Sequence, residues 1–439
     1  MRVLFFFINI AVITAGPLLY LFLDPPAGVL AAAAVLITLF PVINIFPGVY
    51  RNVRVRLAVL AGGSDLLTAF IPSVTVEAAI LIMRIAEGLF TPERDIPFIV
   101  LAVIADGIIF WNGIIRVYAT SVQLGIVWRV LAAVFSLVPV VNFVFLVILI
   151  VITDREYRFE KDYDKREKQL AEARVCDTKY PILLVHGVFF RDSKKFNYWG
   201  RVPDALERCG AKIYYGNQQS ALSVHDSAVE LARRIGQIVN ETGCGKLNII
   251  AHSKGGLDSR YAISRLGCDR YIASLTTVCT PNRGCVFVEQ LYNSIPESGR
   301  QKLAAAYNAA ARTVGDTAPD FLSAVADMRG SACERFNAET PDSPAVFYQS
   351  IGSVERKMRS GRFPLNVSYP LVKKTDGAND GLVAVESMKW GRSFRLVEPT
   401  GNRGISHADM IDLNRENIKG FDIRTYYINL VSELRGWGF

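Results

Sequence analysis

The chain has 439 residues, of which 51% are hydrophobic and 21% are charged. This composition is too apolar for a disordered chain, and the length is sufficient for more than one folded domain. The net charge of +8 lies almost entirely downstream of residue 152, where acidic and basic residues are interspersed without a long basic block. A nucleic-acid partner is therefore not expected.

The first 152 residues contain eight arginines, no lysine and seven acids. Five apolar runs in this part are each long enough to cross about 30 Å of hydrocarbon as a helix. They cover residues 3–23, 27–46, 57–83, 96–117 and 131–152. The beginning of the first run has the composition of a signal peptide, but the four runs that follow favour a first span. We predict an all-α, multi-span transmembrane domain over residues 1–152, with the bilayer as its partner.

The positions of basic residues predict how this domain is oriented. Arg51, Arg54 and Arg56 follow the second run and favour a cytoplasmic loop there. Five spans would then place the second half of the chain outside the cell. However, residues 155–168 carry six basic side chains, which favour the cytoplasm by the same rule.

Two of the runs are interrupted by residues that weaken a span. Gly62 to Asp65 interrupt the third run, and Pro139 with Asn142 interrupts the fifth. If one of these runs does not cross, the number of spans becomes even and the conflict disappears. We expect a multi-pass protein of the cell membrane; the side of its second half is open, with the cytoplasm favoured.

Four acids lie within or beside the apolar runs, and an intramembrane carboxylate is a candidate functional site. Glu77 and Glu87 can lie at the membrane interfaces, whereas Asp106 is near the middle of its run. Asp65 belongs to the interruption of the third run. A transport role for these acids is the weaker interpretation.

The seven cysteines all lie in the second half, and their number is odd, so at least one thiol has no partner within the chain. No pair has the CxxC or Cys/His spacing of a zinc site. We expect free thiols in a reducing compartment, no bound metal and no cofactor. The cysteines are Cys176, Cys209, Cys244, Cys268, Cys279, Cys285 and Cys333.

Residues 153–179 are rich in mixed charge and predict a helical linker. From residue 180 onward, short apolar strand-like segments alternate with helical stripes, which is typical of an α/β domain with a mostly parallel sheet and flanking helices. We predict this domain over residues 180–439. The expected strands are 182–185, 211–215, 247–250 and 274–278, and the expected helices are 226–240 and 255–266.

One junction carries a signal for catalysis. In LNIIAHSKGG, residues 247–256, a serine lies between a buried strand and a helix that opens with glycines. A serine on such a sharp turn needs small residues two positions before and after it, and Ala251 and Gly255 meet that need. The turn presents the Ser253 hydroxyl above the sheet and directs the backbone N–H of Lys254 toward an oxyanion. Ser253 is therefore the predicted nucleophile.

A nucleophilic serine needs a base, which is nearly always histidine. His252 lies inside the turn, His186 ends the first strand, and His225 precedes the serine. Since the order in this type of fold is serine, acid, histidine, His407 is the predicted base.

The acid is expected between Ser253 and His407, after a strand, and residues 365–372 are strand-like. Asp380 is preferred because it lies in a turn that leads into apolar residues, whereas Asp376 is equally explained as a turn residue and stays the alternative. Val188, in the glycine-containing loop after the first strand, is the expected second oxyanion donor.

Four motifs together carry a family resemblance. They are YPILLVHGVFFRD at 180–192, AHSKGGLDSRYA at 251–262, TPNRG at 280–284 and NDGLVAVESMKWG at 379–391. In this order, across residues 179–417, they resemble the bacterial triacylglycerol lipases of the α/β-hydrolase superfamily.

The resemblance implies an α/β-hydrolase fold and hydrolysis of the carboxylic esters of a lipid substrate. It implies Ser253, Asp380 and His407 as the triad and the N–H groups of Val188 and Lys254 as the oxyanion hole. A mobile cap is also implied, for which residues 290–327 are suited. Members of the family can bind calcium near the histidine, but Leu413 stands where a polar ligand is expected beside Asp409, so we predict no metal.

Two other functions stay open at this stage. The membrane half can be the active part, as a transporter or sensor, with a non-catalytic hydrolase-like module. Transfer of the acyl group to an acceptor other than water shares the first half-reaction with hydrolysis. The sequence leaves the acyl length, the head group and the oligomeric state open.

Overall fold

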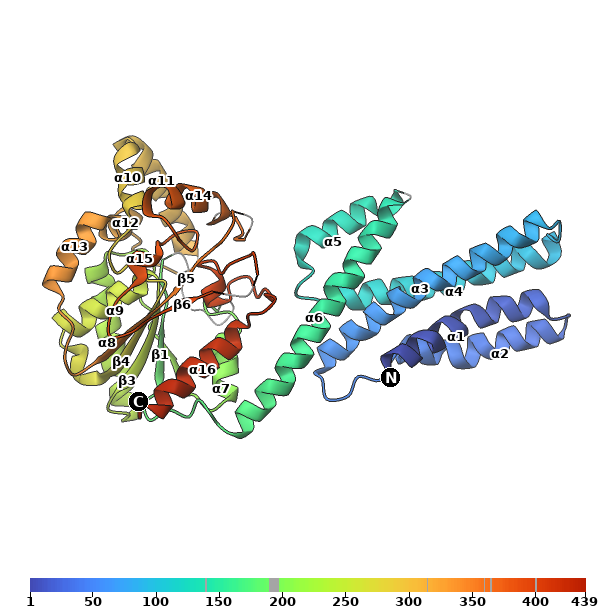
Figure 1. Ribbon diagram of the computed structural model, residues 1–439, viewed down its shortest axis with the longest axis horizontal. Helices are drawn as coiled ribbons and strands as arrows, with labels where there is room; N and C mark the ends of the chain where they lie inside the picture. Colours follow the sequence, from blue (N-terminus) through green and yellow to red (C-terminus); the bar gives the residue numbers. More distant parts are fainter. Residues whose placement is uncertain (139, 189–196, 314, 359, 364, 399–400) are drawn as a thin grey trace. The chain divides into compact units, whose positions relative to one another are not determined.

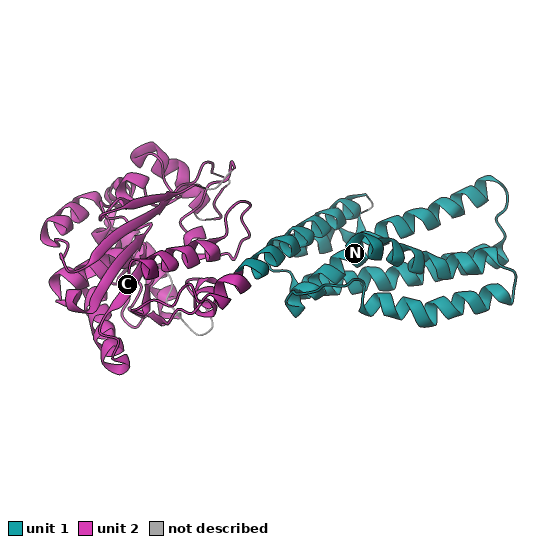
Figure 2. Ribbon diagram, turned by 60° about the horizontal axis from the view of Figure 1, so that its bottom comes forward, with its two compact units in different colours: residues 1–166 teal, residues 167–439 magenta. Residues whose placement is uncertain are grey.

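The computed structural model describes residues 1–138, 140–188, 197–313, 315–358, 360–363, 365–398 and 401–439. The chain forms two compact units, residues 1–166 and 167–439 (Figure 2). Helix α6 (Val141–Glu172) extends past residue 166, so the chain leaves the first unit inside a continuous helix. The predicted boundary at residue 152 falls within this helix.

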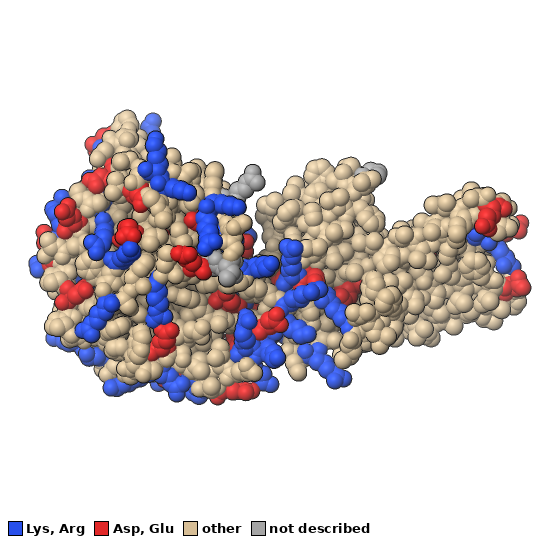
Figure 3. Space-filling view, in the orientation of Figure 1, with Lys and Arg blue, Asp and Glu red and all other residues tan. Residues whose placement is uncertain are grey.

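Unit 1 begins with four helices that are each long and apolar enough to cross a membrane (Figure 1). A helix pairs most of its own backbone N–H and C=O groups, which is the condition for crossing hydrocarbon, and the proline inside each of these helices is tolerated in membrane helices. Charged side chains gather near the helix ends, and the surface between them is almost free of charge in the view of Figure 3. The predicted multi-span membrane domain is confirmed. The helices are α1 (Arg2–Phe22), α2 (Ala27–Ile45), α3 (Val55–Ala86) and α4 (Pro92–Thr120).

The fifth predicted span, residues 131–152, is wrong. The chain forms α5 (Gly125–Val134) and the short 3-10 helix η1 (Phe135–Leu137), then turns back into α6 (Figure 1). Thirteen residues of helix cover about 20 Å, less than the hydrocarbon thickness of about 30 Å. Pro139, which the sequence marks as an interruption, lies outside the described residues. The third run, by contrast, is one unbroken helix, α3.

Small residues bring α3 and α4 close together. A Cβ atom on Gly63 would lie 2.9 Å from the carbonyl oxygen of Gly113, and one on Gly113 would lie 2.7 Å from Leu67 Cγ. Such contacts are typical of membrane helices, where packing rather than water exclusion holds helices together. Ion pairs add to this packing: Arg84 Nε lies 2.6 Å from Asp95 Oδ1.

Unit 2 contains a six-stranded parallel sheet with the order β2-β1-β3-β4-β5-β6. The predicted α/β class is confirmed, and the four predicted strands are β1 to β4. Strands β1, β3 and β4 are buried along their whole length, as expected of strands covered on both faces, whereas the edge strand β2 is half-buried. The strands are β1 (Ile182–Val185), β2 (Ile213–Tyr215), β3 (Leu247–His252), β4 (Ile272–Val278), β5 (Phe347–Ser353) and β6 (Phe394–Val397).

Helices cover both faces of this sheet (Figure 1). On one face, α8 (Val224–Thr242) and α9 (Lys254–Arg265) bury an apolar stripe that includes Leu231 and Ile235. On the other face lie α7 (Val202–Arg208) and α16 (Ile423–Gly436), which pack on each other. The predicted helices 226–240 and 255–266 correspond to α8 and α9.

The prediction of a strand at residues 365–372 is wrong, because the chain forms helix α14 (Leu365–Asp376) there. Its buried residues Tyr369 and Val372 are three positions apart, which is helical spacing. The β-propensity of valine and tyrosine is therefore overridden by packing on one helix face. As a consequence, Asp380 follows a helix rather than a strand.

The segment expected to form a cap is helical. It contains α10 (Val286–Ser294), α11 (Glu297–Thr313) and α12 (Phe321–Asp327), and α13 (Gly330–Glu339) follows. The Asp316 carboxylate, which is 2% exposed, accepts hydrogen bonds from the Ser220 hydroxyl at 2.7 Å and from the Ala221 N–H at 3.2 Å. This contact ties the segment to the loop after β2.

Candidate active site

Ser253 occupies a strained turn between β3 and α9. Its φ of 55° and ψ of −132° are rarely adopted by residues with a side chain. The turn is tight enough to require Gly255, because a Cβ atom there would lie 2.3 Å from the His186 carbonyl oxygen. The Ser253 N–H donates to the Val278 carbonyl at 2.9 Å, which links the turn to the end of β4. This is the geometry expected of a nucleophile elbow.

Asp380 and His407 form a hydrogen-bonded pair. The His407 Nδ1–H donates to Asp380 Oδ2 at 2.8 Å, and the His407 backbone N–H donates to the Asp380 carbonyl at 2.9 Å. The other oxygen of the carboxylate accepts from the N–H groups of Leu382 and Val383 at 3.0 and 2.8 Å. The pair therefore has a fixed orientation, and its tautomer leaves Nε2 of His407 as a proton acceptor.

The other candidate acid has a different position. The Asp376 carboxylate ends α14 and accepts a hydrogen bond from the Phe287 N–H at the start of α10, at 3.1 Å. Its contact therefore joins two helices near the cap and does not involve His407.

His252 connects the serine turn to the His407 loop, a role that the sequence does not reveal. Its Nε2–H donates to the His407 carbonyl at 3.2 Å, and the two rings lie 4.4 Å apart. The Tyr198 hydroxyl donates to His252 Nδ1 at 2.8 Å and accepts from the Gly187 N–H at 3.1 Å. Complete burial lowers the pKa of His252 well below its usual value, so the ring is neutral and can fill both roles.

Of the three predicted triad residues, Asp380 and His407 are joined directly, and Ser253 is linked to them through its neighbour His252. Ser253 directly follows His252, whose ring contacts that of His407, and His407 holds Asp380. In the described part of the chain, no hydrogen bond joins the Ser253 hydroxyl to His407. Catalytic hydrogen bonds are often long without substrate and tighten when it binds.

The predicted oxyanion donors lie on either side of the serine. Val188 follows Gly187, where a Cβ atom would come within 2.7 Å of the Ser253 Cβ, so this loop passes close to the nucleophile. Lys254 is the first residue of α9, and its N–H group faces the N-terminal end of the helix. Its side chain is buried, where Nζ contacts Asp258 Oδ1 at 2.8 Å. Residues 189–192 of the first motif lie outside the described residues.

A group of charged residues lies beside the Asp380 turn. Asp409, which the resemblance places at a calcium-ligand position, forms an ion pair with Arg403 at 2.8 Å. Glu355, two residues after β5, is 2% exposed, and in the described part of the chain neither of its carboxyl oxygens has a hydrogen-bond partner. Burial, with the charges of Asp380 and Asp409, raises the pKa of Glu355 to about 8. This carboxyl therefore holds its proton near neutral pH.

One group of side chains among the described residues has potential metal-ligand atoms close together. These atoms lie within 4.8 Å of one another and belong to His252, Cys279 and His407. The group does not suit zinc. Both ring nitrogens of His252 are hydrogen-bonded, and burial raises the pKa of the Cys279 thiol, which disfavours the thiolate that metals bind. All seven cysteines are free thiols, as predicted.

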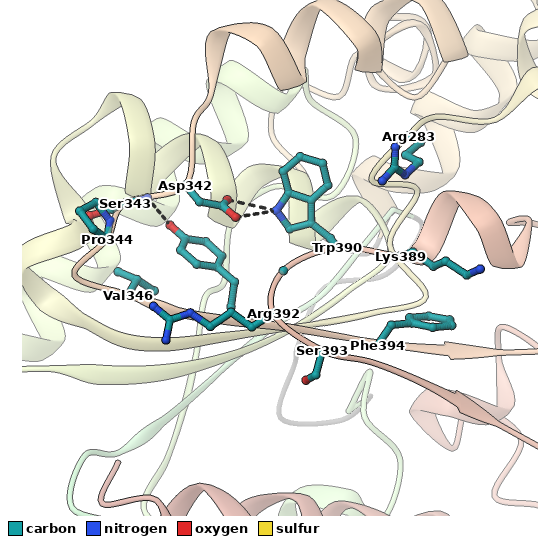
Figure 4. Close-up of a pocket in the computed structure, with 12 residues that line it drawn as sticks. Arg283, Asp342, Ser343, Pro344, Val346, Lys389, Trp390, Arg392, Ser393 and Phe394 are labelled. Atoms are coloured by element: carbon teal, nitrogen blue, oxygen red, sulfur yellow. Dashed lines mark hydrogen bonds between the residues drawn. The ribbon is translucent and has the colours of Figure 1, made fainter.

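A cavity of about 520 Å³ lies apart from these residues, near the starts of β5 and β6 (Figure 4). Trp390 lines it, and its indole N–H donates to the Asp342 carboxylate at 3.1 Å. The Arg260 guanidinium of α9 lies 3.5 Å from the centre of the Trp390 ring system. These contacts indicate that Trp390, in the last of the four motifs, has a structural role.

Comparison with known proteins places the chain near the lipases. It is 36% identical over 117 residues to triacylglycerol lipases of Pseudarthrobacter phenanthrenivorans and of Burkholderia plantarii, which is 26% of this chain and 36% and 32% of theirs. It is 27% identical over 283 residues to triacylglycerol lipase 2 of Saccharomyces cerevisiae, or 60% of this chain and 78% of that protein. The predicted resemblance is confirmed, and the chain spans about a third of the length of the first two relatives.

Part of the chain also resembles solved structures of hydrolases. The mature lipase BlEst2 of Bacillus licheniformis is 19% identical with a TM-score of 0.44, over 58% of this chain and 92% of that one. Phospholipase PlaB of Legionella pneumophila is 12% identical with a TM-score of 0.40, over 59% and 62%. No family model matches the chain. The α/β-hydrolase fold of unit 2 follows from its strand order and from the Ser253 turn.

Proposed function

We propose that the protein is a membrane-bound serine hydrolase that cleaves carboxylic ester bonds of lipids, of the acylglycerol type. The observation that carries this proposal is the hydrogen bond of 2.8 Å between His407 and Asp380, next to a serine on a strained strand-to-helix turn. An imidazole held by a buried carboxylate is the arrangement that activates a serine hydroxyl. The similarity to triacylglycerol lipases supports the ester class.

In the proposed mechanism, the Ser253 oxygen attacks the acyl carbonyl carbon while Nε2 of His407 accepts the hydroxyl proton. Asp380 stabilises the imidazolium that forms. The N–H groups of Val188 and Lys254 bind the oxyanion, and its collapse expels the alcohol, which takes the proton from His407. Water then attacks the acyl-enzyme by the same route in reverse and releases the fatty acid.

The test is the Ser253→Ala variant of the full chain, assayed with a short p-nitrophenyl ester. Removing a triad nucleophile costs about 10⁴- to 10⁶-fold in turnover. Ser264→Ala, on the same helix α9, is the matched control and should retain wild-type turnover. Turnover by Ser253→Ala at the wild-type rate would refute the proposal.

We also propose that unit 2 lies on the cytoplasmic side of the membrane. The four long helices α1 to α4 are an even number, so the chain returns to the side where it started. Helix α5 has only 10 residues, and α6 is apolar only up to residue 153. Neither apolar stretch is long enough to cross, and we interpret this hairpin as a re-entrant segment. The basic residues after the second helix and along α6 then lie on one side, which removes the conflict in the positive-inside rule.

Cys244 reports on this orientation, because it is half-buried whereas the other six cysteines are buried. A membrane-impermeant maleimide should label it only after the cells are permeabilised. Strong labelling of Cys244 in intact cells would place unit 2 outside.

A further inference from the structure

Unit 1 contains a cavity of about 590 Å³ between α3, α4, α5 and α6. This volume is within the range of about 300–1,000 Å³ that is typical of small-molecule sites. Its wall is mostly aromatic and aliphatic. The cavity opens on the apolar surface, where Trp111 and Val103 are 62% and 65% exposed. Aromatic residues that line it are Phe70, Phe110, Trp111, Tyr118, Phe143 and Phe145.

Asp106 is a charged residue in this apolar wall. It lies at the midpoint of α4 and is 7% exposed, and its Oδ1 has no hydrogen-bond partner among the described residues. The carboxyl group of Glu77 from α3 interacts with it, is 4% exposed and has an unpartnered Oε1. A carboxyl oxygen without a donor is costly in an apolar environment, so the cavity is incomplete without a donor.

Three other acids of the helical bundle each have an arginine partner. Asp65 pairs with Arg2 at 2.8 Å, Asp95 with Arg84 at 2.6 Å, and Glu156 with Arg56 at 2.9 Å. Among the described residues, neither Asp106 nor Glu77 has such a basic partner. An arginine of the kind that pairs with these three acids is therefore absent, among the described residues, at the pair whose Asp106 lines the cavity.

We propose that this cavity binds a single-chain amphiphile with a protonated amine head. The ammonium group supplies the donors and the positive charge that Asp106 and Glu77 lack, and the hydrocarbon chain packs on the aromatic wall. A fatty acid would bring a third carboxylate to the pair, and a fatty alcohol would bring no positive charge. The site is independent of ester hydrolysis, since all its residues belong to unit 1.

The experiment uses the purified full chain in micelles of a neutral detergent and measures binding of dodecylamine by calorimetry at neutral pH. The wild type should bind it saturably and more tightly than dodecanol or dodecanoate. Asp106→Asn, which keeps the shape of the side chain, should weaken binding by about tenfold or more. Glu87→Gln, just after α3, is the matched control and should bind as the wild type does.

A second variant tests the cavity without changing its carboxyl groups. A Cβ atom on Gly107 meets no heavy atom within 4 Å, so Gly107→Leu fills the space without a backbone clash and should also weaken binding. Wild-type affinity in both Asp106→Asn and Gly107→Leu would overturn the proposal. Equal or tighter binding of dodecanol or dodecanoate would overturn the choice of an amine.

Discussion

The two units bury polar groups by different means. In unit 1, buried carboxylates such as Asp95 are paired with arginines of neighbouring helices, with Asp106 and Glu77 as exceptions, and apolar clusters pack between the helices. In unit 2, neutral groups such as His252 and Tyr198 form a hydrogen-bond network around the serine turn. Because lipid cannot supply hydrogen bonds, a buried charge in unit 1 needs an oppositely charged side chain beside it. The hydrogen-bond network of unit 2 instead fixes the positions of the side chains around the serine turn.

The largest expected effect concerns the site of unit 2. Asp380→Asn keeps the shape of the side chain but removes the charge that orients His407, and turnover of a p-nitrophenyl ester should fall by about 10⁴-fold. Asp376→Asn, in the same loop region, should have little effect because its contact is with Phe287. If Asp376→Asn reduces turnover as strongly as Asp380→Asn, the assignment of the acid is wrong.

The next effect tests the ion pairs of unit 1. Arg84→Met leaves Asp95, which is fully buried, without its partner, and should lower the free energy of unfolding of the membrane unit by about 3–5 kcal/mol. Arg94→Met breaks an exposed pair with Asp24 and should cost about 1 kcal/mol or less. Thermal unfolding in detergent measures both variants. Equal losses of unfolding free energy in the two variants would show that the buried ion pair contributes no more than the exposed one.

A pH-dependent effect is expected at Glu355. Its pKa is raised from 4.5 to about 8 in the folded state, so the folded protein holds a proton that the unfolded chain releases. This contribution to stability is fully present below the unfolded pKa of 4.5 and is lost progressively as the pH rises to about 8. Glu355→Gln should therefore gain stability relative to the wild type between pH 6 and pH 9, on the order of 2 kcal/mol.

The control for this prediction is Glu386→Gln, because the side chain of Glu386 is 78% exposed. Thermal unfolding of both variants at pH 6 and pH 9 gives the comparison. A difference between Glu355→Gln and the wild type that does not change with pH would contradict a buried, protonated carboxyl.

The smallest expected effect concerns the network around His252. Tyr198→Phe removes the hydroxyl that donates to His252 Nδ1 and leaves a buried acceptor unsatisfied, at a cost of about 1–3 kcal/mol. Because the same hydroxyl holds Gly187 beside the serine, turnover should fall by about tenfold with little change in its pH profile. Wild-type turnover and stability together would show that the network does not position the site.

The sequence by itself determined the features that depend on short stretches of chain. Hydropathy identifies the helices of unit 1, because about 20 apolar residues in a row suffice to cross a bilayer. The alternation of strands and helices indicates the α/β class, and the small residues around Ser253 indicate its turn, because steric conflict there acts between close neighbours. These predictions need no information about distant contacts.

Only the tertiary structure decided what depends on segments that are far apart in the chain. It paired His407 with Asp380 instead of Asp376, joined Glu77 to Asp106, and gave Asp409 an arginine partner. It also divided the fifth apolar run between the end of α5 and the start of α6, since composition alone does not show where a helix ends and the next one begins. Hydrogen bonds and ion pairs form between groups that the packing of helices and strands brings within about 3 Å, and local sequence does not encode that distance.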